Sequence, residues 1–450
     1  MPALLAPVTR CLRPMLSILH LALALPISLA LAAPGLPALA PSSAVGSEVP
    51  ALDGLLWPPP PMVGAAVSGV RSEYGAAVAL ASTGPDGAAW AVVGAPRAAG
   101  GGRVLVHRRV GGGVTHWPGA GRPLIPPGRV RPGALLGTAV AIRGPLAVAG
   151  APRAEGAGRV FVRRVGPRGP EGPIVELRPA PAHGGAAAFG AALALWRGPE
   201  GRARLAVGAP ESTVGVPGRG AVELAGEVQV FVRSGLDGWT LERVLRAPAP
   251  RFAARFGASV CFLGDRVVIG APGDDHAGPG SGRVHVFGPA GEPVLELGPP
   301  GVPAGAPGAR YGEQVAALGA ARFAAAAPGL AAVEIASITP AGGLVHEELL
   351  SGSVIDGFGA AIAAGRGGLL VGEPRAGVGA HGRVAVFSLG PGGWSRAGSL
   401  HPVHADVAGE FGVSVAADGG LVLVGEPGDG DPCPPASTGC GAGGAIAFSD

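Results

Sequence analysis

The chain has 450 residues, of which 48% are hydrophobic and only 14% are charged, and its formal net charge is +3. This profile is the opposite of the apolar-poor, highly charged composition of disordered proteins, so we expect a folded core. All 34 basic residues are Arg and there is no Asn, which is typical of a GC-rich, bacterial genome. The near-neutral balance gives no indication of a nucleic-acid partner.

The first forty residues have the layout of a secretory signal. Arg10 and Arg13 precede an apolar run over residues 15–32, and small-residue patterns at 30–32 and 38–40 follow. We predict a signal peptide over residues 1–40, with cleavage near 32–40, and a linker over 41–50. An uncleaved anchor is the alternative, which a proline inside the run disfavours. The mature protein is therefore expected to be secreted, periplasmic or on the cell surface, without stable membrane insertion.

The rest of the chain is organised by a repeat of three ordered elements. A Gly count of 82 and a Pro count of 48 would indicate low complexity if no period were present. The first element opens on an aromatic or Leu followed by Gly, at Tyr74, Leu136, Phe189, Phe256, Tyr311, Phe358 and Phe411. The second, GAP-like element ends at Pro96, Pro152, Pro210, Pro272, Pro328, Pro374 and Pro427. The third begins at Gly102, Gly158, Gly226, Gly282, Ala332, Gly382 and Gly444.

Each element reads as a short strand, because small and β-branched residues alternate between Gly and Pro boundaries. A fourth apolar stretch, such as GWTLERVL, follows the third element. Four strands in each of seven units predict an all-β, seven-bladed β-propeller over residues 51–450, in which the aromatic of each unit packs between neighbouring blades. The blades are expected at 70–124, 133–180, 186–246, 253–299, 308–351, 355–401 and 408–450.

Two units depart from the pattern. The fifth has AAAAP in place of GAP, so we expect a weaker blade there. The seventh ends without a fourth apolar stretch, whereas residues 51–63 are apolar and precede the first unit. We predict that residues 51–63 supply the missing strand and close the ring.

The pairing of these elements resembles the FG-GAP repeat, the unit of the integrin α-subunit propeller and of many bacterial exported proteins. The stretch FGASVCFLGDRVVIGAPGDDHAGPGSGRVHVFGPAG carries the resemblance most clearly, and it extends over residues 74–450. Integrin-type repeats commonly hold calcium in an acidic loop between FG and GAP. The longer hairpins at that place contain one carboxylate each, Asp86 or Glu200. One carboxylate is too few for a calcium site, so no metal or other cofactor is predicted.

Acidic residues gather instead in the loops after the second element, where propellers usually present binding groups. Asp274, Asp275 and His276 follow the GAP of the fourth unit, and Asp429 and Asp431 follow that of the seventh. The largest insertion, residues 211–227, begins at Glu211. We predict that these loops form a binding face, because long loops on a rigid scaffold often carry function. Solvated turn chemistry is the alternative.

The cysteines add a structural prediction. Cys433 and Cys440 bracket a turn-rich loop, and in an exported protein they are expected to form a disulfide; two free thiols are the alternative. Cys261 lies within a predicted strand and is expected to be a buried, small apolar residue.

No catalytic motif is present: the chain lacks G-x-S-x-G, H-E-x-x-H, a phosphate loop and C-x-x-C. Three arginines, Arg97, Arg153 and Arg375, recur after the GAP-like motif and either attract anions or solvate equivalent turns. We therefore expect a non-enzymatic, adhesion-like interaction module that binds a protein or carbohydrate. The alternatives are a polysaccharide-active lyase or hydrolase and an envelope repeat protein without a dedicated ligand.

Overall fold

The computed structural model describes residues 72–83, 87–109, 121–180, 187–235, 237–301, 307–402 and 409–428, and the backbone of strand 444–449. All of them belong to one compact unit, Leu52–Asp450. The predicted signal peptide, the closing strand at 51–63, Asp429, Asp431, Cys433 and Cys440 lie outside the described residues. Within the described part, no helix is long and apolar enough to cross a membrane.

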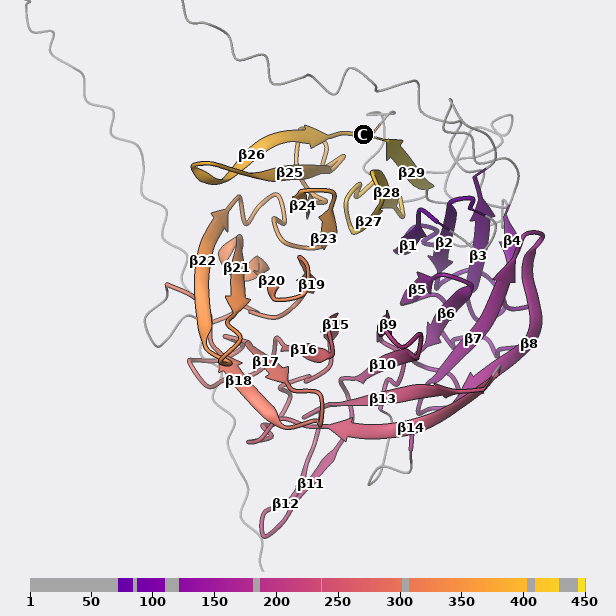
Figure 1. The fold of residues 1–450 in the computed structure, drawn as a ribbon, viewed down its shortest axis with the longest axis horizontal. Helices are drawn as coiled ribbons and strands as arrows, with labels where there is room; N and C mark the ends of the chain where they lie inside the picture. Colours follow the sequence, from indigo (N-terminus) through magenta and orange to yellow (C-terminus); the bar gives the residue numbers. More distant parts are fainter. Residues whose placement is uncertain are drawn as a thin grey trace, which may run out of the picture. The chain divides into compact units, whose positions relative to one another are not determined.

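The described residues form antiparallel sheets arranged around an axis (Figure 1). The first two four-stranded sheets are β1 (Ala77–Ala81), β2 (Trp90–Ala95), β3 (Arg103–Arg108) and β4 (Arg122–Pro123), then β5 (Val140–Arg143), β6 (Leu146–Ala151), β7 (Arg159–Gly166) and β8 (Gly169–Leu177). The third comprises β9 (Ala192–Arg197), β10 (Ala203–Ala209), β13 (Glu227–Ser234) and β14 (Gly238–Leu245). The fourth comprises β15 (Ser259–Leu263), β16 (Arg266–Ala271), β17 (Arg283–Phe287) and β18 (Pro293–Leu297).

Two further four-stranded sheets complete the six. They are β19 (Val315–Ala317), β20 (Arg322–Ala327), β21 (Ala332–Ile338) and β22 (Leu344–Ser351), then β23 (Ile362–Gly365), β24 (Gly368–Glu373), β25 (Arg383–Gly390) and β26 (Gly393–Leu400). The fifth unit therefore has all four strands despite its degenerate sequence. A single 3-10 turn, Pro328–Leu330, is the one helical element that the described ranges contain.

The seventh sheet has three strands, β27 (Ser414–Asp418), β28 (Leu421–Glu426) and β29 (Gly444–Ser449). The described residues thus show six complete four-stranded blades rather than the seven predicted, together with this three-stranded sheet. Residues 51–63, the predicted fourth strand of the seventh blade, lie outside the described residues. The inner strands of the seventh sheet nevertheless contact the first blade. Asp418 Oδ2 accepts hydrogen bonds from the Ser82 backbone N–H (2.7 Å) and hydroxyl (2.8 Å), and the Ser414 hydroxyl donates to the Gly75 carbonyl at 2.7 Å.

The two glycines of the repeat motif explain why the motif recurs. Within every unit, the N–H of the Gly after the aromatic donates to the carbonyl of the second-strand Gly, or of Ala326 in the fifth unit, at 2.8–3.2 Å. Between units, the second-strand Gly lies against the backbone of the next unit: a Cβ on Gly270 would fall well inside 3.0 Å of the Gly312 carbonyl oxygen. Gly94, Gly150, Gly208, Gly372 and Gly425 make the same close approach to the next unit. A side chain at these positions would push neighbouring blades apart.

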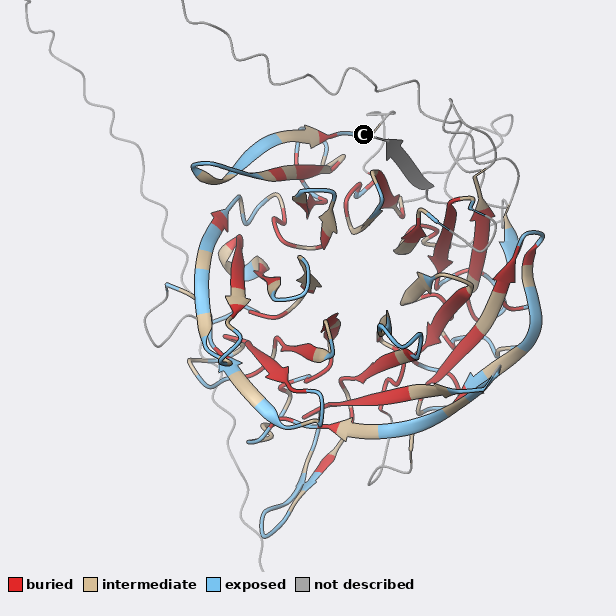
Figure 2. Cartoon of the chain, in the orientation of Figure 1, coloured by how far each residue is buried: buried red, intermediate tan, exposed pale blue. Residues whose placement is uncertain are grey.

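The core lies between the blades. The motif aromatics are buried there, as predicted, and the outer strands are the exposed ones (Figure 2). Phe256, for example, packs with Val228 and Val230 of the third blade and with Ile269 of its own. Cys261 is only partly buried, between the fourth and fifth blades, rather than fully buried as predicted. Because each face of a blade is covered by its neighbour, the sheets bury far more apolar surface together than any blade could alone.

Candidate functional site on the loop face

The propeller has two faces, which differ in the strand connections that they carry. Parallel bridges such as Gly226↔Phe256 and Gly282↔Tyr311 place the start of each third strand beside the start of the next unit. The loops after the second strands and the connections between blades therefore share one side, which we call the loop face. The connections between the first and second strands and between the third and fourth strands belong to the other side, which we call the hairpin face.

The predicted long insertion forms a hairpin on the loop face. Its strands β11 (Val214–Val216) and β12 (Gly220–Val222) make a separate two-stranded sheet that projects from the ring (Figure 1). The base of the hairpin is fixed to the connection between blades three and four: the N–H groups of Ala253, Arg255 and Phe256 donate to the carbonyls of residues 223–225 at 2.9–3.2 Å. Backbone hydrogen bonds to the connection between blades three and four thus hold the base of the insertion in place.

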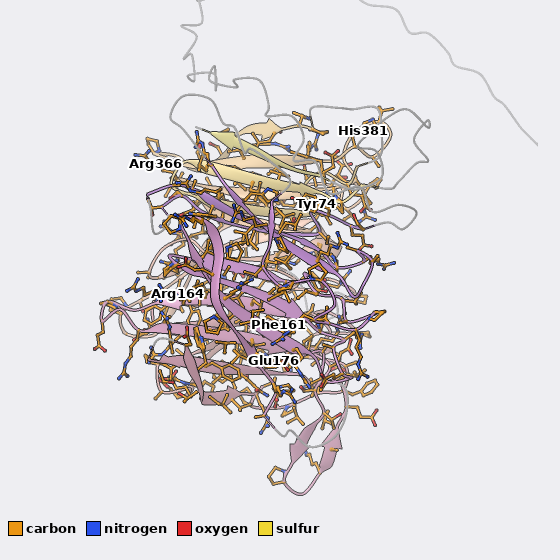
Figure 3. The ribbon with its side chains drawn as sticks, turned by 90° about the vertical axis from the view of Figure 1, so that its right-hand side faces the viewer. Tyr74, Phe161, Arg164, Glu176, Arg366 and His381 are labelled. Carbon is orange, nitrogen blue, oxygen red and sulfur yellow. The ribbon has the colours of Figure 1, made fainter. Side chains whose placement is uncertain are left out.

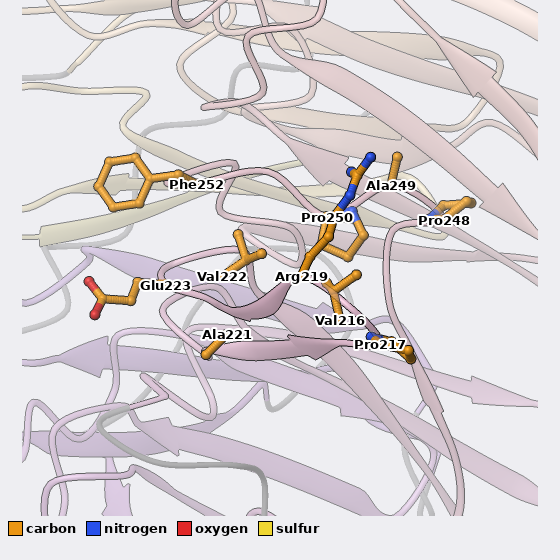
Figure 4. A pocket seen from close by; sticks show the side chains of 10 residues that line it. All are labelled: Val216, Pro217, Arg219, Ala221, Val222, Glu223, Pro248, Ala249, Pro250 and Phe252. Carbon is orange, nitrogen blue, oxygen red and sulfur yellow. The ribbon is translucent and has the colours of Figure 1, made fainter.

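A groove with a volume of about 760 Å³ lies between the hairpin and this connection (Figure 4). Its lining is largely apolar: Val216, Pro217, Ala221, Val222, Pro248, Ala249, Pro250 and Phe252, with Arg219 and Glu223 as the charged members. Phe252 is 67% exposed and the neighbouring Leu224 is 38% exposed. An exposed aromatic beside a concave apolar surface is typical of a recognition site.

The acidic turn of the fourth unit meets the same connection. Arg251, which lies between Pro250 and Phe252, pairs with Asp275 (Nη1 to Oδ1, 3.1 Å) and contacts His276 (Nη2 to Nδ1, 3.3 Å). Asp274 has a different role, since its side chain is 2% exposed and accepts a hydrogen bond from the His276 N–H at 2.8 Å. The Asp274 carbonyl also accepts from Ser281 and Gly282. The structure therefore brings the insertion and the acidic turn together, but Asp274 stabilises its own turn.

Glu211 is engaged in a salt bridge between blades. Its two carboxylate oxygens accept from the Arg153 guanidinium of blade two at 2.7 and 2.8 Å. Arg97 similarly pairs with Glu73 at 2.8 Å, and the Arg375 N–H donates to the Asp356 carbonyl. Arg97 and Arg153 thus neutralise neighbouring carboxylates, which is the turn-solvating interpretation of these arginines.

Comparison with known proteins agrees with this architecture. The FG-GAP repeat family matches residues 239–287, which run from β14 of the third blade to β17 of the fourth. This match and the propeller arrangement of the described sheets together support an FG-GAP-type propeller protein. No curated protein matches it. Among solved structures, a streptogramin B lyase has a TM-score of 0.48 at 10% identity, covering 85% of this chain and 96% of that one. A putative 6-phosphogluconolactonase from Bacteroides uniformis has a TM-score of 0.48 at 11% identity, covering 73% and 85%. Neither likeness carries a functional argument.

A second cavity of the FG-GAP propeller, about 740 Å³, lies on the outer rim between blades four and five. Glu334 lines this cavity. Its carboxylate accepts a hydrogen bond from the Tyr311 hydroxyl and pairs with His346. Burial, together with the Glu334 charge, raises the pKa of Tyr311 well above its usual value. Sequence reasoning missed this cluster. The sequence feature that could have indicated it is that both tyrosines of the chain, Tyr74 and Tyr311, stand at the first position of a repeat unit. Tyr74, like Tyr311, forms a hydrogen bond with a polar residue of the third strand, His107.

Glu426 of the FG-GAP propeller stands where most units have the Ala of GAP. Burial raises the pKa of Glu426 to about 7, while the charge of His381 acts in the opposite direction. The equivalent Glu373 of blade six pairs with Arg383 and with Arg396. Across the described ranges, no group of three or more His, Cys, Asp or Glu side chains is arranged to hold a metal ion. Figure 3 shows Tyr74 and His381 in the side view of the propeller.

Proposed function

We propose that this FG-GAP propeller is a non-enzymatic interaction module that binds a protein or carbohydrate ligand in the loop-face groove. The exposed Phe252 ring beside the apolar groove is the observation that carries the proposal. Further exposed apolar side chains lie in other loops of the same face: Val354, Ile355 and Val378. Apolar surface offered to solvent on a rigid ring is better suited to recognition than to chemistry.

The polar groups around the groove support the same proposal. Asp275 is paired with Arg251, and Glu211 with Arg153. A carboxylate whose oxygens already accept hydrogen bonds from a close or bidentate Arg is poorly placed to give a proton to a substrate or to take one from it. These pairs are more useful as fixed, polar edges of a binding surface.

Binding arrays test the proposal. The purified protein is screened against protein and carbohydrate arrays, and each hit is re-measured with Phe252→Asp. A charge at this 67% exposed position should weaken binding at least about tenfold by blocking apolar contact. The matched control is Leu389→Asp, at an exposed apolar side chain (46%) at the end of β25 on the hairpin face. Equal binding by both variants and the wild type would remove the groove from the proposal.

A polysaccharide-active enzyme is the second candidate. The observation that favours it is Glu426, whose raised pKa of about 7 suits a general acid. Such an enzyme requires a second carboxylate across the site. Depolymerisation of a polysaccharide panel by the wild type, and its loss in Glu426→Gln, would establish this candidate. If neither turnover nor binding is detected, the envelope repeat protein becomes the best account.

We also propose that residues 51–63 complete the seventh sheet as its fourth strand. In the six complete blades the fourth strand ends 7–14 residues before the motif residue of the next unit. Residue 63 precedes Tyr74 by 11 positions. The family match supports this offset, because it begins on the outer strand of one blade and continues into the next. Deletion of residues 51–63 should lower the melting temperature, and an unchanged melt would contradict the assignment.

Export and the disulfide belong to the same proposal. We expect the mature protein to begin between residues 32 and 40 and to contain a Cys433 to Cys440 disulfide, as an oxidising compartment allows. N-terminal sequencing of the mature protein locates the cleavage site. A thiol titration of the denatured, signal-free protein should find one free thiol, Cys261, and three would contradict the disulfide.

A further inference from the structure

We infer that the loop-face groove takes one class of ligand, an extended peptide segment with an apolar core and flanking charges of both signs. The inference rests on the proposed function and deepens it, because it chooses between the protein and carbohydrate ligands that the proposal allows. The choice depends on three features of the groove: its lining, the positions of its two charged residues and the rigidity of its walls.

The lining favours apolar side chains over sugar hydroxyls. Of the ten residues that line the groove, eight are apolar, and the other two are Arg219 and Glu223. None of the ten carries a hydroxyl or an amide on its side chain, the neutral groups that commonly orient a polar ligand. A bound sugar would therefore leave hydroxyls without partners, which weakens binding. An apolar peptide side chain packed on Phe252, which is 67% exposed, gains from burial without this cost.

The two charged residues stand at different ends of the hairpin wall (Figure 4). Arg219 belongs to the turn at the tip of the hairpin, between β11 and β12. Glu223 follows β12 at the base, where its carbonyl accepts a hydrogen bond from the Ala253 N–H. Both side chains are exposed, and among the described residues neither takes part in a salt bridge. The pair therefore selects a ligand that carries one acidic and one basic group.

The spacing and the walls suit a short, extended core. Because Arg219 and Glu223 are four positions apart in the sequence, their Cα atoms are separated by at most about 14 Å, a length that about four extended residues cover. The walls include three prolines, Pro217, Pro248 and Pro250. Proline fixes φ, so these walls are ordered before a ligand arrives, which lowers the entropic cost of binding.

Fluorescence anisotropy of labelled synthetic peptides with the purified protein tests the inference. All peptides share a Leu-Phe-Leu-Leu core and differ in their flanks, which are Glu and Lys in either order, two Glu, two Lys or two Ser. The wild type should bind at least one mixed-flank peptide about tenfold or more tightly than the two-Glu and two-Lys peptides, with a smaller difference at high salt. A mixed-flank peptide with a Gly-Ser core should not bind, because it lacks the apolar contact.

Charge reversal should change which flanks are preferred. Glu223→Arg gives the groove two positive ends and should move the preference to the two-Glu peptide, whereas Arg219→Glu should move it to the two-Lys peptide. A merely structural role for either residue would weaken all peptides alike. Arg366→Glu, at an exposed arginine on the hairpin face, is the matched control and should leave the preference unchanged. A thermal melt of each variant checks that the fold is retained.

Three results would overturn the inference: no binding of any peptide, equal binding of mixed and like-charge flanks by the wild type, or a preference that charge reversal does not move. Phe252-dependent binding of a carbohydrate on the arrays, without peptide binding, would remove the peptide class and leave the proposed function. The absence of Phe252-dependent binding for every peptide, protein and carbohydrate would remove both.

Discussion

Replacing Gly270 with Ala should separate the fourth and fifth blades. A Cβ on Gly270 would fall well inside 3.0 Å of the Gly312 carbonyl oxygen and of the Ser259 hydroxyl. The backbone at Gly312 has little freedom to withdraw, because its N–H donates to the Ala326 carbonyl (2.9 Å) and its carbonyl accepts from the Ser259 hydroxyl (2.7 Å). Real Cβ atoms keep at least 3.0 Å from such neighbours. One of these hydrogen bonds or the blade packing must therefore give way.

The expected cost follows from these two effects. Overpacking a rigid core costs about 1–3 kcal/mol, and the loss of one net hydrogen bond adds about 1 kcal/mol. We therefore expect Gly270→Ala to lower the free energy of unfolding by about 3 kcal/mol. In the fifth unit, Ala326 takes the place that Gly270 has in the fourth. The Ala326 Cβ lies 3.4 Å from where a Cβ on Gly359 of the sixth unit would stand, so the methyl group is accommodated there by a wider spacing from the next unit.

Denaturant unfolding of matched variants measures this cost. Gly298→Ala is the control, because a Cβ there would meet no atom within 4 Å and the backbone is not left-handed. It should be neutral or stabilising by less than about 1 kcal/mol. If the two variants unfold at the same denaturant concentration, the close approach of blades does not explain the repeated glycine.

Three further changes test other parts of the account. His285 is 2% exposed, and among the described residues neither of its ring nitrogens has a hydrogen-bond partner. Burial, followed by the Arg283 charge, lowers its pKa to about 3. The unfolded chain therefore binds a proton on His285 more readily than the folded chain, so the free energy of unfolding should fall as the pH decreases from about 6.5 towards 3. His285→Leu should raise the melting temperature and make it depend less on pH over this range. An unchanged pH dependence of the melting temperature would contradict the assignment. Glu373→Gln removes the buried partner of Arg383 and Arg396, which are 30% and 38% exposed, while Arg383 keeps its ion pair with Asp356. The variant should cost about 1–3 kcal/mol in chemical unfolding, and a loss below about 0.5 kcal/mol would show that the cluster is not coupled to the fold. Asp274→Ala should cost about 1–3 kcal/mol because the His276 N–H loses its acceptor, while Asp275→Ala should cost less than about 0.5 kcal/mol, and the reverse order would refute the structural role of Asp274.

The repeat could be predicted because its elements are local. Strand alternation and the Gly and Pro boundaries of each unit determine where strands start and end, and the aromatic needs a covered position, as Phe256 and Phe411 have. The turn before the aromatic could not be predicted in the same way. Glu73, Arg255 and Arg310 all adopt left-handed backbone conformations there, with φ between 51° and 57°. Because these are not glycines, the composition gives no signal for the turn.

The candidate site was predicted only in outline. The sequence identified the long insertion and the acidic turn, but Arg251 and Phe252, which bring them together, lie in an ordinary-looking connection. Such juxtapositions depend on how two blades meet, which no local pattern encodes. Asp274 and Asp275 are adjacent and chemically identical, yet one is buried within its turn and the other is exposed. The division of roles between them follows from backbone geometry alone.

The most direct test of the loop-face proposal is hydrogen exchange of the wild-type protein with and without a ligand found on the arrays. The account predicts added protection in residues 214–225 and 248–252, which form the two sides of the groove. Protection confined to the hairpin face, or to the rim cavity around Glu334, would place the ligand elsewhere and contradict the proposed function.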